Sequence, residues 1–232
     1  MIYEIFCIFA PRKPLVMLKT IYNKYDKSLI AALPVEQFQG RIIVILSAKD
    51  TESAVRYLLS QPILGFDTET RPSFRRGNQY KAALLQVSTP DTCFLFRLNY
   101  TGLTPALIRL LEDQQVMKIG LSWHDDLNAL RRLGSFKPGR FIDIQDHVRD
   151  LGIEDLSLQK LYANLFGLKI SKRQQLSNWE ADILNDKQKL YAATDAWACI
   201  QIYNEIIRLK ESGDYKLIIK EENDEANISE KR

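Results

Sequence analysis

Two carboxylates stand two positions apart at the end of an apolar stretch, ILGFDTET (63–70). The stretch predicts a strand, and side chains along a strand alternate between its two faces. Asp67 and Glu69 therefore share one face, whereas Phe66 and Thr68 point to the other. Two like charges this close raise each other's pKa unless a cation neutralises them. The spacing alone fits two solvated acids at a strand end as well as a metal site.

A second acidic pair lies in WHDDLNALRRLG (123–134), which has the pattern of a helix. At about 100° per residue, Asp126 falls on the apolar side of this helix and Asp125 falls roughly opposite. The apolar side is defined by Leu127, Leu130 and Leu133. A carboxylate on that side, near a helix N-terminus, needs a cation, the helix dipole or backbone N–H groups as its partner. Capping and catalysis both fit these aspartates, and Asp126 is the candidate for catalysis.

A third acidic position lies in KLYAATDAWACIQIY (189–203), which has the pattern of a long helix. Tyr191 and Asp195 are four residues apart and therefore lie on one helix face. Aspartate is a poor residue for the middle of a helix, and the neighbours of Asp195 are small and apolar. Small neighbours allow the helix to approach another element closely. An exposed aspartate is the plainer interpretation, but the apolar context weighs against it.

Taken together, the acidic positions indicate a site for hard cations. Asp67, Glu69, Asp126 and Asp195 come from one strand and two helices, and their mutual repulsion requires cations if all turn inward. The chain has two histidines and three cysteines, and none stands at metal-ligand spacing, which disfavours a zinc site. Carboxylates favour Mg²⁺ or Mn²⁺. Two such ions about 4 Å apart suit phosphodiester hydrolysis, because one activates the attacking water and the other stabilises the leaving oxygen.

Length and composition describe an ordinary globular chain. The 232 residues are 46% apolar and 26% charged, with a formal net charge of +3. One large domain is expected, and a fully disordered chain, collagen and a disulfide scaffold are excluded. Widely spaced cysteines fit a reducing compartment, and no apolar run reaches the roughly 18 residues of a membrane span. The first sixteen residues lack the order of a secretory signal. We expect a cytoplasmic protein with no membrane partner.

Periodicity and helix signals place the acidic residues among alternating elements. Strands are expected at 41–46, 63–70, 80–89, 92–98, 116–121 and 141–144, and helices at 51–60, 104–113, 124–133, 157–166 and 185–210. Thr51 is expected to cap the first helix, and the third and fourth strands to form a hairpin. The order predicts an α/β fold, a mixed sheet flanked by helices. The expected units are an N-terminal extension (1–40), one domain (41–212) and a charged, disordered tail (213–232).

The three acidic motifs also resemble those of a known family. FDTET, HDDLNAL and YAATD resemble the exonuclease motifs of the DEDD superfamily, in its tyrosine-type branch. The segment QLSNWE (175–180) ahead of the last motif is similar to that of ribonuclease D and the Werner-syndrome exonuclease domain. The resemblance covers about residues 41–206. It implies a ribonuclease-H-like fold and a metal-dependent 3′–5′ exonuclease that releases nucleoside monophosphates from DNA or RNA 3′ ends.

The resemblance also implies a role for each acidic residue. Asp67 would bridge two divalent cations, Mg²⁺ or Mn²⁺. Glu69 and Asp195 would complete the site of the ion that holds the attacking water, and Asp126 would support the other ion. Tyr191 would orient the attacking water with its hydroxyl. The one-turn separation of Tyr191 and Asp195 agrees with these roles.

Substrate contacts are expected from residues beside the motifs. Cations there contact phosphates without reading sequence, and a tryptophan can stack on a base. The candidates are Thr68, Arg75, Arg76, His124 and Trp179, with Lys169, Lys172 and Arg173 as further cations. Surface solubility explains any one cation equally well, and packing or capping fits Trp179 and His124.

Two other functions fit the same motifs. One is a catalytically silent nucleic-acid-binding module on this fold, and the other is a ribonuclease-H-like endonuclease. About 20 residues follow the last expected helix, so targeting is expected from the core or from a partner in trans, such as a helicase. The oligomeric state is left open by the sequence.

Overall fold

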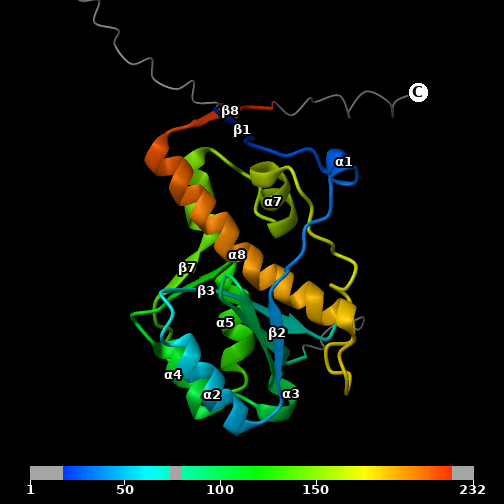
Figure 1. Ribbon diagram of the computed structural model, residues 1–232, viewed down its shortest axis with the longest axis vertical. Helices are drawn as coiled ribbons and strands as arrows, with labels where there is room; N and C mark the ends of the chain where they lie inside the picture. The colour runs from blue at the N-terminus through cyan, green and yellow to red at the C-terminus, as the bar shows by residue number, and fades with distance from the viewer. Residues whose placement is uncertain (1–17, 74–79, 221–232) are drawn as a thin grey trace, which may run out of the picture.

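The computed structural model describes residues 18–73 and 80–220, and its centre is a six-stranded sheet (Figure 1). The strand order is β2–β5–β4–β3–β6–β7. The bounds are Arg41–Ile45 (β2), Ile63–Thr70 (β3), Ala82–Ser88 (β4), Thr92–Arg97 (β5), Met117–Gly120 (β6) and Phe141–Asp143 (β7). Strand β4 is antiparallel to both its neighbours, and the other adjacent pairs are parallel. The predicted mixed sheet and the hairpin of β4 and β5 are confirmed.

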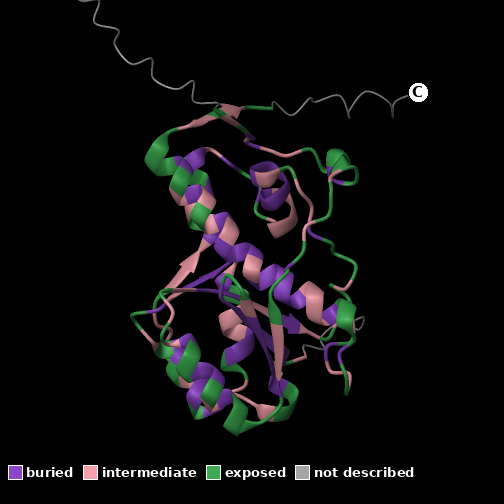
Figure 2. Cartoon of the chain, in the orientation of Figure 1, coloured by how far each residue is buried: buried purple, intermediate pink, exposed green. Residues whose placement is uncertain are grey.

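Helices cover both faces of this sheet. One face packs against α2 (Ala48–Leu58), α4 (Pro105–Glu112) and α5 (Trp123–Arg131). The other packs against the long α8 (Asp186–Ser212), with α7 (Leu158–Phe166) beside it. Figure 2 shows α8 buried along its middle and exposed toward its C-terminal end. The shorter helices are α1 (Lys27–Ile30), α3 (Leu98–Thr101), α6 (Ile144–Val148) and the 3-10 helix η1 (Arg149–Leu151). The predicted α/β fold is confirmed, and no helix in the described ranges is long and apolar enough to cross a membrane.

Helix starts follow side-chain caps, with one correction to the prediction. Thr104 caps α4, and Asn185 caps α8. Helix α2 begins after Ser47, whose hydroxyl accepts a hydrogen bond from the Asp50 backbone N–H. The prediction that Thr51 caps this helix is wrong, because Thr51 is buried inside it and its hydroxyl donates to the Ser47 carbonyl at 2.8 Å. A hydroxyl followed three residues later by a carboxylate is the stronger start signal.

Strand β3 and helix α8 touch through their backbones. A Cβ atom at Gly65 would lie 1.9 Å from the carbonyl oxygen of Ala196, so only glycine fits at this point of β3. The thiol of Cys199 lies 3.8 Å from the Phe66 carbonyl oxygen in the same contact region. Asp67 follows the contact on the strand by two residues, and Asp195 precedes it on the helix by one. The contact therefore brings the first and third acidic motifs together.

The first and last segments that the structure describes form a second, two-stranded sheet that was not predicted. Strand β1 (Lys19–Tyr22) pairs in parallel with β8 (Tyr215–Ile218). The expectation of a disordered tail from residue 213 is therefore wrong over β8, and residues 221–232 lie outside the described part of the chain. Each strand is only four residues long, so its alternation is too short to recognise in sequence. Pairing between these two segments creates the sheet.

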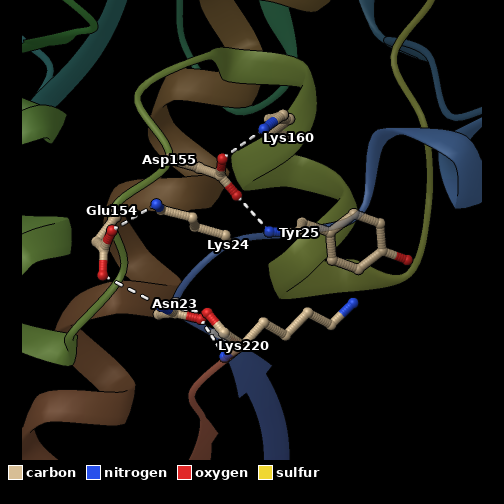
Figure 3. A network of polar contacts seen from close by, with 7 residues as sticks. All are labelled: Asn23, Lys24, Tyr25, Glu154, Asp155, Lys160 and Lys220. Carbon is tan, nitrogen blue, oxygen red and sulfur yellow. Dashed lines mark hydrogen bonds and ion pairs between the residues drawn. The ribbon is translucent and has the colours of Figure 1, made fainter. Parts of the chain in front are cut away.

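Residues 18–40, called here the N-terminal arm, are anchored by a polar network. Its members are Asn23, Lys24, Tyr25, Glu154, Asp155, Lys160 and Lys220 (Figure 3). The Asn23 side chain accepts from the Lys220 backbone N–H at 2.8 Å and donates to a Glu154 carboxylate oxygen at 3.1 Å. Asp155 accepts from the Tyr25 backbone N–H at 2.6 Å. The network joins both segments to the loop that enters α7. The arm then descends past α8 to β2 (Figure 1).

Candidate active site

Three carboxylates converge where the end of β3 meets the middle of α8. Asp67 and Glu69 leave β3 on the face that carries α8, and Asp195 reaches them from the helix. One oxygen from each carboxylate lies within 4.8 Å of the oxygens from the other two. The three residues line a cavity of about 300 Å³. Carboxylate oxygens at this separation form a set that could hold a divalent cation.

Burial and mutual repulsion favour the protonated forms of these carboxylates. Burial raises the pKa of Asp67 well above its usual range, and the charges of Asp126 and Asp195 raise it further. Burial and then the charge of Asp67 raise the pKa of Glu69 to about 10. Burial raises the pKa of Asp195 to about 7, although a hydrogen bond with Tyr191 opposes this effect. A bound cation would offset the repulsion, so cation binding and proton release are coupled.

Tyr191 lines the same cavity, one helical turn before Asp195. The four-residue spacing predicts this position, and the nearby Tyr191 hydroxyl lowers the pKa of the Asp195 carboxyl. Burial and then the negative charges of Asp195 and Glu69 raise the pKa of the Tyr191 hydroxyl. The phenol therefore keeps its proton. A neutral hydroxyl both donates and accepts hydrogen bonds, so it can orient a small molecule in the cavity.

Of the two adjacent aspartates in α5, the structure places Asp126 beside the strand. The Thr68 hydroxyl donates a hydrogen bond to the Asp126 carboxylate, whereas Asp125 is exposed. Burial raises the pKa of Asp126 to about 6, and the Thr68 hydrogen bond works against this rise. Asp126 does not belong to the group of three carboxylates, but its charge raises the pKa of Asp67. The fourth acid therefore stands at the edge of the cluster.

Asp143 holds the start of the helix that carries Asp126, and sequence reasoning missed it. Its carboxylate accepts from the backbone N–H groups of Ser122 at 3.0 Å and Trp123 at 2.9 Å. It also caps α6 by accepting from the Gln145 N–H at 2.9 Å. Ser122 adopts a left-handed conformation, with φ of 64°, so the chain enters α5 through a turn that is costly for a non-glycine residue. The sequence does show an aspartate at the end of a predicted strand. Its hydrogen-bond partners lie about twenty residues earlier, so the sequence alone does not connect them.

A buried thiol borders the carboxylate cavity without offering a metal ligand. Cys199 lies one turn after Asp195 and lines the cavity. Its thiol donates to the Asp195 backbone carbonyl at 3.4 Å. Burial and then the charge of Asp67 raise its pKa, so the sulfur keeps its proton and does not act as a thiolate ligand. The donors in the cavity are therefore carboxylate oxygens, which suits a hard divalent cation.

The predicted role of Trp179 in stacking on a base is wrong. The side chain has 0% relative exposure, so no nucleic-acid base can reach it. Its ring instead packs behind Tyr191, with 6.0 Å between ring centroids. The segment before α8 turns this tryptophan into the core because Leu84 and the alanines of α8 provide an apolar site for it. Trp179 therefore does not line the cavity, and its ring lies behind that of Tyr191, which does.

The other expected substrate contacts are placed as follows. Thr68 lines the cavity. His124 is exposed, and its Nε2 atom lies 3.1 Å from the Asn128 amide nitrogen on the outside of α5, so the structure does not bring it to the carboxylates. Arg75 and Arg76 lie outside the described residues. Of the expected cations, Lys169, Lys172 and Arg173 line the carboxylate cavity or the cavity beside it.

The sequence of this domain matches a known family over most of its length. The profile of the 3′–5′ exonuclease domain matches residues 42–209. The chain belongs to this family. Within it, the chain is 30% identical over 184 residues to the mouse "Bifunctional 3′-5′ exonuclease/ATP-dependent helicase WRN", a match that covers 75% of the chain and 13% of that protein. It is 33% identical over 180 residues to the Drosophila melanogaster "Exonuclease 3′-5′ domain-containing protein 2", covering 73% of the chain and 30% of that protein.

Solved structures of 3′–5′ exonuclease domains share this fold. The Aedes aegypti Nibbler EXO domain superposes with a TM-score of 0.69 at 21% identity and covers 76% of the chain and 94% of that domain. Escherichia coli RNase D superposes with a TM-score of 0.66 at 19% identity and covers 75% of the chain and 46% of that protein. The predicted ribonuclease-H-like fold is confirmed by these likenesses. The family membership and the acidic cluster together support divalent-metal binding.

Proposed function

We propose that this protein is a 3′–5′ exonuclease that hydrolyses nucleic acid from its 3′ end and releases nucleoside monophosphates. The observation that carries the proposal is the convergence of Asp67, Glu69 and Asp195 within 4.8 Å, with Tyr191 in the same cavity. Membership of the 3′–5′ exonuclease family supports it. Without a cation, the carboxylates of this cluster favour their protonated forms, and a bound cation would stabilise the charged forms.

The cofactor is two divalent cations, Mg²⁺ or Mn²⁺, in a two-metal mechanism. Asp67, Glu69 and Asp195 would hold one cation, and Asp67 with Asp126 would hold the second, directly or through water. Bound cations would activate the attacking water and stabilise the departing oxygen. The donor set supports this choice, because all three close ligands are oxygens and the neighbouring Cys199 keeps its proton.

The chain's own residues orient the reactants. The neutral Tyr191 hydroxyl would position the attacking water, because Tyr191 lines the same cavity as the carboxylates. Thr68 would hold Asp126 toward β3 through their hydrogen bond. Positioning of this kind lowers the barrier because the reacting atoms no longer have to be brought together from solution.

DNA and RNA 3′ ends are both proposed substrates. A solved relative, Trypanosoma brucei RNase D, is described in complex with RNA U12 and shares the fold at 20% identity. A helicase or another nucleic-acid-processing protein acting in trans and a cytoplasmic location stay predictions from the sequence. Labelled DNA and RNA strands of one sequence, with single-stranded or recessed 3′ ends, compared in Mg²⁺ and Mn²⁺, would rank the substrates.

The test of the function uses strands labelled at the 5′ end. The wild type should give a ladder that shortens from the 3′ end, and Asp67→Asn should abolish the ladder but retain binding. Internal fragments at early times would identify an endonuclease. Binding without degradation of any 3′ end would identify the silent nucleic-acid-binding module. Glu180→Gln is a matched control, since Glu180 pairs with Arg71 at 3.3 Å outside the carboxylate cavity.

A further inference from the structure

A second cavity adjoins the carboxylate cavity, and Tyr191 lines both. Its volume is about 460 Å³. The two cavities share four lining residues, Gln159, Ile170, Lys172 and Tyr191. These shared side chains place the two cavities next to each other. We call this second cavity the arm groove, since residues 35–37 of the N-terminal arm form one of its walls.

The arm groove carries positive charge where the neighbouring cavity carries negative charge. Its cations are Lys169, Lys172, Arg173 and Lys187, and its acid is Glu36. Lys172, Arg173 and Lys187 are exposed, and within the described part of the chain none of these three forms an ion pair. Cations without acidic partners attract phosphates, and each phosphate contact releases counterions. The acidic carboxylate cavity suits cations, and the basic arm groove suits phosphate groups.

The arm wall is part of the folded structure. Val35 forms a parallel bridge with Lys169. The Glu36 backbone N–H donates to the Lys169 carbonyl at 2.9 Å, and the Lys169 N–H donates to the Pro34 carbonyl at 2.9 Å. Further along, the buried Phe38 donates its backbone N–H to the Thr194 hydroxyl of α8 at 3.1 Å. The arm is therefore fixed both to the segment before α8 and to α8 itself.

This wall lies outside the family domain. The family match begins at residue 42, and the arm residues that line the groove are 35–37. The arm therefore contributes to the groove from residues that precede the family match. Residues 35–37 line the same cavity as Tyr191.

From these contacts we infer that the arm groove binds the phosphodiester backbone of a single strand on the 5′ side of the reacting nucleotide, with Arg173 and Lys187 as phosphate contacts. The inference rests on the proposed exonuclease function, because it takes the 3′ end to lie among the carboxylates. A groove of 460 Å³ is within the size range of small-ligand sites and holds part of one strand, not a duplex. The preferred substrate is therefore a single-stranded 3′ end longer than the two nucleotides at the cut.

The first test measures binding of a single-stranded oligonucleotide in Ca²⁺ as salt is raised. Arg173→Ala/Lys187→Ala should lower the slope of log Kd against log salt by about 1.4, since each contact to a single strand contributes about 0.7. Lys49→Ala/Lys216→Ala is the matched control, because it removes the same charge from exposed positions outside the groove. An equal change in both double variants would overturn the inference, since it would reflect net charge alone.

The second test concerns the arm itself. Gln37 lines the groove and Gln39 does not, although both are exposed residues of one segment. Gln37→Glu should weaken binding of the oligonucleotide about fivefold and Gln37→Lys should strengthen it by a similar factor, from one added charge at a short distance. Gln39→Glu and Gln39→Lys should change binding much less. Equal effects at the two positions would show that the arm does not face the strand.

A length series separates this inference from the proposed function. In the Arg173→Ala/Lys187→Ala variant, kcat/KM for a strand of about ten nucleotides should fall at least about tenfold more than kcat/KM for a dinucleotide, because charged hydrogen bonds to the longer strand are lost. Equal falls for both lengths would refute the groove while the exonuclease function stands. A wild-type enzyme that degrades no 3′ end would refute the exonuclease function, and the binding slopes would still report on the groove.

Discussion

The indole of Trp179 lies against the ring of Tyr191, with 6.0 Å between centroids and 34° between ring planes. Trp179 has 0% relative exposure and Tyr191 lines the carboxylate cavity. A buried ring behind Tyr191 limits how far the tyrosine can tilt, because a close-packed core leaves no free volume on that side. We therefore expect Trp179 to position Tyr191.

Removing the Trp179 ring from behind Tyr191 should lower the rate of hydrolysis. Trp179→Leu should reduce kcat by about tenfold to a hundredfold, since a displacement of about 1 Å at a reacting group can cost that much. Trp179→Phe keeps an aromatic ring in place and should lose much less. The measurement is kcat at saturating oligonucleotide, with thermal unfolding followed in parallel. A Trp179→Leu enzyme with the wild-type kcat would show that the ring contact does not position Tyr191.

The adjacent aspartates of α5 give a second prediction with a built-in control. Asp126→Asn should reduce activity by about two orders of magnitude or more, because the second cation would lose a carboxylate that holds it. Asp125→Asn should leave activity near the wild-type value, since Asp125 is exposed and Asp126 receives the Thr68 hydrogen bond. The same strand-shortening assay measures both variants. The reverse ranking would mean that Asp125 is the metal-site residue.

Substitutions of Tyr191 and Asp195 should differ in their effect on cation affinity. Tyr191→Phe removes a hydroxyl that orients water but leaves the carboxylates, so cation affinity should stay near that of the wild type and activity should fall about 10²-fold. Asp195→Asn removes a cation ligand and should lose both activity and cation affinity. Calorimetric titration with Mn²⁺ separates the two. Equal losses of affinity would argue against the assigned roles.

When no cation is bound, the raised carboxyl pKa values should make the protein less stable as the pH rises. Asp195 has a pKa of about 7 in the folded chain and an ordinary value of 3.8. Between these two pH values, Asp195 therefore keeps its proton in the folded state and has lost it in the unfolded state. This contribution to stability is fully present below a pH of about 3.8 and is lost as the pH rises from there to about 7, at a limiting slope of about 1.4 kcal/mol per pH unit for one proton.

Divalent cations should reverse this loss. Mg²⁺ competes with protons for the carboxylates, so it should raise Tm more at a pH of about 8 than at about 6. Thermal unfolding with Mg²⁺ and with a chelator at both pH values measures the difference. Asp67→Asn removes a cation ligand and should show little Mg²⁺-dependent gain at either pH. A larger Mg²⁺ effect at the lower pH would contradict the raised carboxyl pKa values.

The contact between β3 and α8 can be tested with one methyl group. Gly65→Ala would place a Cβ atom 1.9 Å from the Ala196 carbonyl oxygen, so the helix must shift or the strand must bend. The expected destabilisation is about 1–3 kcal/mol, with a loss of activity because Asp67 and Asp195 move apart. Gly134→Ala is the control, since its nearest contact is an ordinary 3.4 Å to the Leu103 side chain. Equal melting temperatures would show that the backbone contact is not tight.

Much of the site could be predicted because its residues lie on regular elements. The alternation of β3 places Asp67 and Glu69 together, and the helical repeat places Tyr191 above Asp195. The leucine side of α5 selects Asp126. In each case the orientation of a side chain follows from local periodicity, which a sequence displays directly.

The remaining features depend on contacts between distant segments. Trp179 lies in an irregular segment with no periodicity to show that it turns inward. Asp143 caps a helix that begins twenty residues before it, at the left-handed Ser122. Strand β1 exists because β8 pairs with it from the other end of the chain. Such contacts are decided by tertiary packing, and short segments carry too few residues to show a pattern.

The spacing of the carboxylate cluster is fixed by main-chain atoms. Gly65 and Ala196 meet backbone to backbone, so the distance from β3 to α8 does not depend on the size of any intervening side chain. Apolar residues elsewhere in the core can be exchanged for others of similar volume without moving the acids relative to one another. A domain built in this way can accumulate many substitutions around its site and keep the site's geometry. The contact at Gly65 thus allows the sequence around the site to diverge while the distance between the acidic residues stays the same.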